Sequence, residues 1–168
     1  VLIPMTITRA FSLQGIPFYI LLGVVGGLMS AYFTYIYEKI NATFKKISSP
    51  WLRIVVGGAL LGLLIYIMPP LYGEGHEIIN HLKEGHPELS LSSNIFGWDL
   101  SNAWVIILLL AALTFAKVIA TSVTFGAGGV GGIFSPMLFM GGVMGNCLAR
   151  IINEFPILGY KAALPNFT

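Results

Sequence analysis

The stretch TFGAGGVGGIFSP, residues 124–136, joins two long apolar segments and is the most informative part of the chain. Five of the seven residues from Gly126 to Gly132 are glycine, and an apolar run follows at once. The first four N–H groups of a helix have no partner within the helix, and the helix dipole places about half a positive charge there. A glycine loop that leads into a helix is therefore suited to binding an anion through its backbone, although by itself such a loop is more often a simple packing turn. Pro136 would fall in the first helical turn, where its missing N–H is not needed.

Four apolar segments are present, at residues 16–37, 51–72, 102–123 and 133–152. Each has about the 20 residues that a helix needs to cross a bilayer. Backbone groups in hydrocarbon must be hydrogen-bonded within their own segment, so helix is the state we expect for all four. The sequence thus predicts an all-α fold, a polytopic bundle of transmembrane helices.

The composition agrees with a membrane protein. Hydrophobic residues make up 56% of the chain and charged residues 10%, whereas soluble proteins carry about 25% charged residues. A chain of this size cannot bury so much apolar surface in a soluble core, so the lipid bilayer must cover part of it. The net charge of +2, without a dense basic cluster, gives no indication of nucleic-acid binding.

The loops on either side of the second segment differ in charge. Residues 38–50 contain three lysines and one glutamate, whereas residues 73–101 contain five acidic residues and one lysine. Because cytoplasmic loops carry an excess of basic residues, we expect residues 38–50 inside the cell and residues 73–101 outside.

The apolar segments lack the groups that other functions need. They contain no His or Asp, and Glu is absent between Trp104 and Arg150. A membrane-embedded enzyme would need an acid, base or nucleophile there, and a cation transporter would normally place a carboxylate at mid-membrane. Backbone amides bind an anion by partial charges and can release it again, which favours anion transport. Another secondary transporter with a glycine-rich discontinuous helix is the alternative.

Residues Gly132-Ile133-Phe134-Ser135-Pro136 match the Gly-x-Phe-x-Pro signature of the CLC chloride channels and chloride/proton antiporters. The surrounding sequence, from about Phe115 to Gly145, resembles that family too, with a Thr-rich apolar segment before the glycine run. A looser resemblance extends upstream to the Pro69-Pro70 pair. The chain therefore resembles the CLC family over most of its length, with one specific segment.

This resemblance implies a fold of two halves with inverted topology, assembled as a homodimer with an anion pathway in each subunit. Residues 1–168 would be a partial transmembrane domain from the start of the second half, which the missing first half of the same protein would complete. The N–H groups of Ile133 and Phe134 would bind chloride or a similar anion. Gly132 and Pro136 would shape the turn, and Phe134 would line the pathway. The resemblance implies transport and no enzymatic activity, no metal, and no cofactor apart from chloride as the transported ligand.

The sequence also departs from the family pattern. The motifs Gly-Ser-Gly-Ile-Pro and Gly-Lys/Arg-Glu-Gly-Pro, which supply a coordinating serine and the gating glutamate, are absent from the 168 residues, as is the family's pore tyrosine. Gly15-Ile16-Pro17 matches only part of the first motif. A voltage-gated chloride channel and a proton-coupled antiporter therefore both stay open.

Three further features have less specific interpretations. Lys117 can contact an anion, but snorkelling or pairing near an aqueous vestibule is favoured. His76, His81 and His86 recur every five residues, which on a helix turns each by about 140°, so an acidic solvated loop is preferred to a metal site. Glycines four residues apart, Gly23 and Gly27, Gly58 and Gly62, and Gly141 and Gly145, predict close helix packing.

Overall fold

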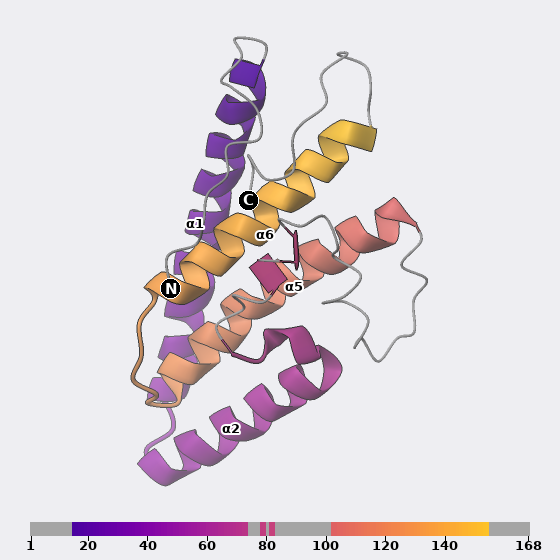
Figure 1. Cartoon of the computed structure of the whole chain (residues 1–168). Helices are drawn as coiled ribbons and strands as arrows, with labels where there is room; N and C mark the ends of the chain where they lie inside the picture. Colours follow the sequence, from indigo (N-terminus) through magenta and orange to yellow (C-terminus); the bar gives the residue numbers. More distant parts are fainter. Residues whose placement is uncertain (1–14, 74–77, 80, 83–101, 155–168) are drawn as a thin grey trace.

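The computed structural model describes residues 15–73, 78–79, 81–82 and 102–154 (Figure 1). Every regular element in these ranges is helical: α1 (Ile16–Lys45), α2 (Pro50–Ile67), the short 3-10 helix η2 (Pro69–Leu71), α5 (Ala103–Gly126) and α6 (Phe134–Glu154). Four of them, α1, α2, α5 and α6, are long and apolar enough to cross a membrane. The prediction of an all-α transmembrane helical bundle is therefore confirmed.

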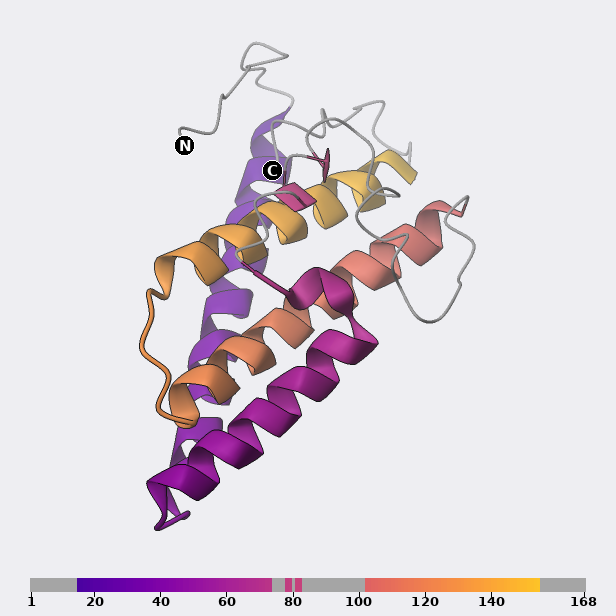
Figure 2. The same cartoon turned by 60° about the horizontal axis from the view of Figure 1, so that its bottom comes forward.

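Helix α5 is the centre of the bundle. It contacts α1, α2, η2 and α6, and both views show it lying between α6 and α2 (Figures 1 and 2). In the most apolar 18-residue stretch of α5 and of α6, 56% of the residues are buried, against 11% in α1 and 6% in α2. The outer faces of α1 and α2 are therefore left for lipid or for other protein segments to cover.

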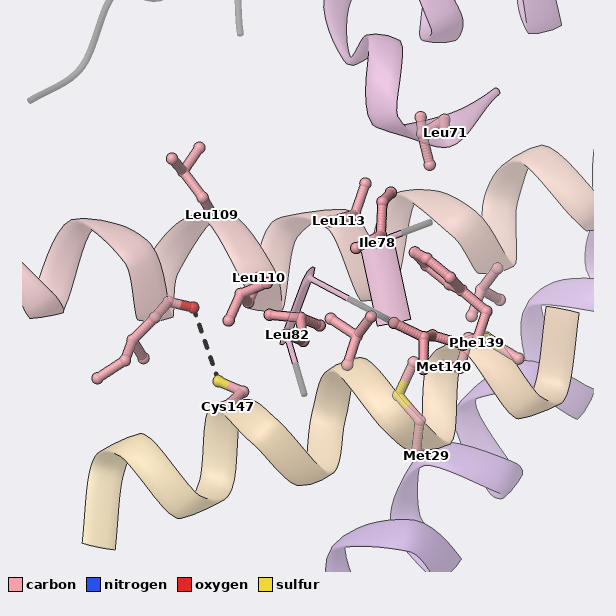
Figure 3. Packing of buried hydrophobic residues seen from close by; sticks show 14 of the residues in the cluster. Met29, Leu71, Ile78, Leu82, Leu109, Leu110, Leu113, Phe139, Met140 and Cys147 are labelled. Carbon is pink, nitrogen blue, oxygen red and sulfur yellow. Dashed lines mark hydrogen bonds between the residues drawn. The ribbon is translucent and has the colours of Figure 1, made fainter. Parts of the chain in front are cut away.

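The core lies where α5 faces α6. Leu110 and Leu113 of α5 and Phe139 and Val143 of α6 are completely buried, and Leu82 fills the space between the two helices (Figure 3). These residues belong to a continuous hydrophobic cluster that also includes Met29 of α1. A buried Leu or Phe side chain contributes roughly 1.5–3 kcal/mol by leaving water, but within a membrane close packing and van der Waals contact carry the association of the helices.

Helix α1 continues eight residues beyond the predicted end of the first segment, residue 37. The apolar run stops at Glu38, but Glu and Lys are good helix formers, so the charges end the hydrophobic run without ending the helix. The predicted loop at residues 38–50 is accordingly reduced to residues 46–49. Arg53 closes this short turn by donating from Nε to the Ile47 carbonyl at 2.7 Å.

Helix α2 ends at Ile67, five residues before the predicted end of the second segment. The reason is the Pro69-Pro70 pair. Proline disfavours helical backbone in the residue before it, and Met68 has φ −130° and ψ 81°. The chain then turns through η2, which brings residues 71–73 back toward α5 (Figure 2).

The close packing predicted at glycine pairs is not met at Gly23 and Gly27 or at Gly58 and Gly62 within the described residues. Gly145, of the third pair, is buried in α6. Gly23, Gly27, Gly58, Gly62 and Gly141 have no neighbouring atom within 4 Å of the place where a Cβ would stand. Close approach occurs instead at two other glycines. A Cβ on Gly57 would overlap the methyl group of Ala127, and one on Gly126 would lie 2.9 Å from the Phe44 ring. These contacts join the C-terminal ends of α1 and α5 to each other and the middle of α2 to the end of α5.

Candidate functional site

The glycine run ends α5 in a defined way. The N–H of Gly129 donates to the Thr124 carbonyl at 2.9 Å, and the N–H of Gly128 donates to the Phe125 carbonyl at 3.0 Å. Gly128 has φ +100°, a conformation that L side chains rarely adopt. These two bonds and the left-handed residue form a Schellman motif, the common glycine-dependent helix ending.

Position 129 needs glycine because there is no room for a side chain, and not because of its backbone angles. A Cβ at this position would lie 2.7 Å from the Thr124 carbonyl oxygen and 2.8 Å from its Cγ2. Gly131 and Gly132 differ, because nothing lies within 4 Å of a Cβ on either. The first part of the glycine run thus ends a helix, and the second part leaves the backbone open.

Helix α6 begins directly after the open part of the run. Its first residue is Phe134, and the Ile133 carbonyl accepts the first α-helical bond, from the N–H of Met137 at 3.1 Å. Pro136 is the third helical residue, where its missing N–H leaves no bond unmade. The N–H groups of Ile133 and Phe134 donate to no carbonyl among the described residues. The sequence prediction that a helix starts at these two amides therefore agrees with the structure.

A cavity of about 300 Å³ lies beside this helix start. Gly132 and Pro136 line it from the loop and α6, and Thr121 and Thr124 line it from α5. Its remaining wall comes from the end of α2, from η2 and the residues that follow, and from Lys117. Three separate parts of the chain therefore build one partly polar cavity next to the Gly-x-Phe-x-Pro segment.

The four predicted site residues divide into two groups. Gly132 and Pro136 line the cavity, whereas the side chains of Ile133 and Phe134 do not. Phe134 is 78% exposed and Ile133 36% exposed, so both side chains point away from the interior of this chain. The structure brings the first pair together with Lys117 and leaves the second pair for partners outside the described residues.

Lys117 is buried and bound to backbone oxygens. Its Nζ donates to the Leu71 carbonyl at 3.0 Å and to the Gly73 carbonyl at 2.7 Å, and it lies 5.1 Å from the centre of the Phe139 ring. Only 6% of the residue is exposed. The ammonium group thus connects the end of η2 to α5, so the pairing predicted for this lysine is found, with carbonyl groups as the partners.

The electrostatics of the helix start come mainly from the backbone. The unbonded amides of the first turn carry partial positive charges, and the dipole of the 21-residue helix α6 adds to them. Lys117 adds a full positive charge to the cavity wall, reduced locally by the two carbonyl dipoles that it binds. The arrangement can attract a small anion, and no carboxylate from residues 104–150 opposes it.

Ser135, between two of the predicted site residues, was not singled out from the sequence. Its hydroxyl is buried at the second position of α6 and has no hydrogen-bond partner among the described residues. Buried hydroxyl groups are nearly always hydrogen-bonded. The signal that could have found it is a serine in the first turn of a helix that follows a glycine loop. His76 and His86 of the histidine series lie outside the described residues.

Comparison with known proteins identifies the chain's relatives. The family model described as voltage gated chloride channel matches residues 1–164. The chain belongs to this family. Together with its four long apolar helices, membership of the chloride channel family makes this an integral, multi-pass membrane protein.

Curated relatives match over about three quarters of the chain. The voltage-gated ClC-type chloride channel ClcB of Salmonella dublin is 28% identical over 131 residues, 77% of this chain and 27% of the relative. A putative ClcB-like chloride channel protein of Ralstonia nicotianae is 27% identical over 128 residues, 76% of this chain and 26% of the relative. An uncharacterized protein of Methanocaldococcus jannaschii is 26% identical over 133 residues, 76% of this chain and 29% of the relative. The chain spans little more than a quarter of the length of these relatives, and no solved structure matches it.

Proposed function

We propose that the full-length protein moves chloride, or a similar small anion, across the cell membrane. The observation that carries this proposal is the start of α6, where the Ile133 and Phe134 amides are unbonded beside a cavity that Gly132 and Pro136 line. Membership of the chloride channel family and the printed names of the ClcB relatives support the same function. We infer that Gly132, Ile133, Phe134 and Pro136 form one part of the anion-binding site.

Backbone amides suit a site that must release its ion. A full positive charge in direct contact with the anion would hold it too tightly, whereas partial charges at a helix N-terminus bind it more weakly. In this structure the nearby full charge, Lys117, is already bonded to two carbonyls. An anion at the start of α6 would therefore meet amide groups first, with Lys117 acting over a longer distance.

One helix start cannot complete the binding shell. An anion that leaves water needs several donors at once, because each missing bond costs a few kcal/mol. The remaining donors would come from the first half of the protein, with residues 1–168 forming the beginning of the second half, and two such subunits would form a homodimer. The exposed side chain of Phe134 is available to line a pathway between the two halves.

The competing functions need groups that these segments lack. A proton relay, a cation site or a catalytic dyad would require a carboxylate or histidine in α5 or α6 before Arg150, and the sequence has neither there. Both a chloride channel and a chloride/proton antiporter fit the α6 site equally, because the site itself binds only the anion.

Anion flux from liposomes tests the proposal. The full-length protein is reconstituted in vesicles loaded with potassium chloride. Valinomycin is then added so that potassium can leave and balance the charge, and chloride efflux is followed with a chloride electrode. Chloride should leave faster than from protein-free vesicles. Equal rates with and without protein would refute the proposed transport. Efflux that also needs a proton ionophore would favour the antiporter over the channel.

A further inference from the structure

The C-terminal end of α1 presents a basic surface at the level of the lipid headgroups. At 1.5 Å per residue the 30 residues of α1 extend about 45 Å, whereas the hydrocarbon core of a bilayer is about 30 Å thick. The apolar part of α1 ends at Tyr37, so the last two turns, which carry Glu38, Lys39 and Lys45, extend beyond the hydrocarbon. The lysines stand on a helix instead of in a loop.

The basic residues at this end of α1 differ in their contacts and exposure. Arg53 is committed to the backbone, because its Nε donates to the Ile47 carbonyl at 2.7 Å and its guanidinium also reaches the Lys45 carbonyl at 3.5 Å. Lys39 lies against Tyr35, with its Nζ 3.4 Å from the hydroxyl oxygen and 5.4 Å from the ring centre. Lys45 and Lys46 are exposed, and their side chains bond to no described residue. Two lysines are therefore directed to the surroundings.

Aromatic residues mark the same end as a membrane interface. Trp51, at the start of α2, is 78% exposed, and Tyr35, one turn before Lys39, is 60% exposed. Exposed Trp and Tyr are typical of the headgroup level, where the ring meets both lipid and water. Lys45 and Lys46 lie between these two aromatic residues in the chain and closer to Trp51, so we expect their ammonium groups near the lipid phosphates.

We propose that Lys45 and Lys46 form a binding surface for the headgroup of an anionic phospholipid, with Trp51 beside the bound lipid. A groove of about 470 Å³ runs along this end of α1 and is lined by Asn41 and Lys45. Glu38 lines the same groove and is the one acidic residue between Ile16 and Tyr72. Its carboxylate opposes an anion, so it lowers the affinity that the lysines provide.

The simpler explanation of these lysines is that they only set the orientation of the chain in the membrane. The two explanations differ in what the lysines do once the protein is folded. An orienting charge needs no bound lipid in the folded protein, whereas a binding surface holds an anionic headgroup in preference to a neutral one. The selectivity expected from electrostatic attraction is about fivefold for each lysine and decreases with salt.

Quenching of Trp51 fluorescence measures this selectivity. The full-length protein is reconstituted in symmetric phosphatidylcholine bilayers that contain a small fraction of brominated phosphatidylglycerol or, in parallel, brominated phosphatidylcholine. The difference between the native protein and the Trp51→Phe variant isolates the signal of Trp51. Because both leaflets have the same composition, the orientation of the protein does not affect the result. We expect brominated phosphatidylglycerol to quench several-fold more strongly than brominated phosphatidylcholine.

Matched variants test which side chains are responsible. Lys45→Gln with Lys46→Gln should bring the ratio of the two quenchers close to one, and Lys45→Arg with Lys46→Arg should keep it. Glu38→Gln should raise the ratio, which no structural role of the lysines would produce, and it stays informative if the double Gln variant fails to fold. An unchanged ratio in the folded double Gln variant would overturn the proposal. So would displacement of the lipid by inorganic phosphate at matched ionic strength, since the surface would then bind free anions.

Discussion

Lys117 and Gly73 are 44 residues apart in the chain, and the Nζ of the first donates to the carbonyl of the second at 2.7 Å. The same ammonium group donates to the Leu71 carbonyl at 3.0 Å, so one side chain of α5 fixes the turn that follows η2. Lys117 also lines the cavity beside Gly132 and Pro136. Lys117 therefore ties together two parts of the cavity wall, α5 and the turn after η2.

Replacing Lys117 by methionine should destabilise the protein by about 1–3 kcal/mol, because two carbonyls would lose their donor in a buried place. Lys117→Arg should keep most of the stability, since a guanidinium can donate to the same oxygens. Thermal unfolding of the purified full-length protein in detergent measures both. A methionine variant as stable as the native protein would show that the Lys117 bonds do not hold this wall.

The two halves of the glycine run should respond differently to a methyl group. Gly129→Ala places a Cβ against the Thr124 carbonyl and should cost about 1–3 kcal/mol. Gly131→Ala meets no atom and should change stability by less than about 0.5 kcal/mol. Unfolding temperatures of the two variants test the pair directly. Equal losses at both positions would contradict the helix ending described for α5.

Gly132→Val should reduce chloride flux by about tenfold, equivalent to about 1.4 kcal/mol, while leaving the folded protein stable. The structure has room for the new side chain, so the fold should tolerate it, but the side chain would enter the lining of the cavity. Gly131→Val is the matched control, since Gly131 is equally open and does not line the cavity. Flux per folded protein in liposomes is the measurement, and a Gly132 variant with native flux would count against the site.

The orientation of α1 can be checked by cysteine labelling. Position 45 ends α1 on the side that the lysines assign to the cytoplasm, and position 88 belongs to the acidic stretch assigned to the outside. An impermeant thiol reagent applied to intact cells should label Glu88→Cys and not Lys45→Cys. The native Cys147 is buried and serves as the background. Labelling of position 45 from outside would reverse the assignment.

The sequence predicted the four long helices of the described residues because length and hydropathy determine them. The helix ends were harder, since they depend on local chemistry that hydropathy does not measure. Lys45 continues a helix although it is charged, and Pro69 stops one although its surroundings are apolar. The start of α6 was located within one residue because the glycine run and Pro136 act through the backbone alone.

The cavity beside α6 could not be predicted in the same way. It is built from α5, η2 and the loop before α6, and nothing in a single segment indicates which distant carbonyls Lys117 will reach. For two of the glycine pairs, in contrast, the sequence predicted contacts that the described residues do not make. The spacing allows close packing, but no atom of the described chain lies within 4 Å of a Cβ on Gly23 or Gly58. Spacing shows that a helix face can pack closely and does not identify its partner.

Bromide in place of chloride gives the most direct test of the central claim, that the backbone at the start of α6 binds the transported anion. Crystals of the full-length protein are soaked in bromide, and anomalous scattering locates the ion. The account predicts a bromide peak within hydrogen-bonding distance of the Ile133 and Phe134 amides, and loss of that peak in the Gly132→Val variant. Bromide bound only elsewhere in the protein, with those two amides donating to protein carbonyls, would contradict it.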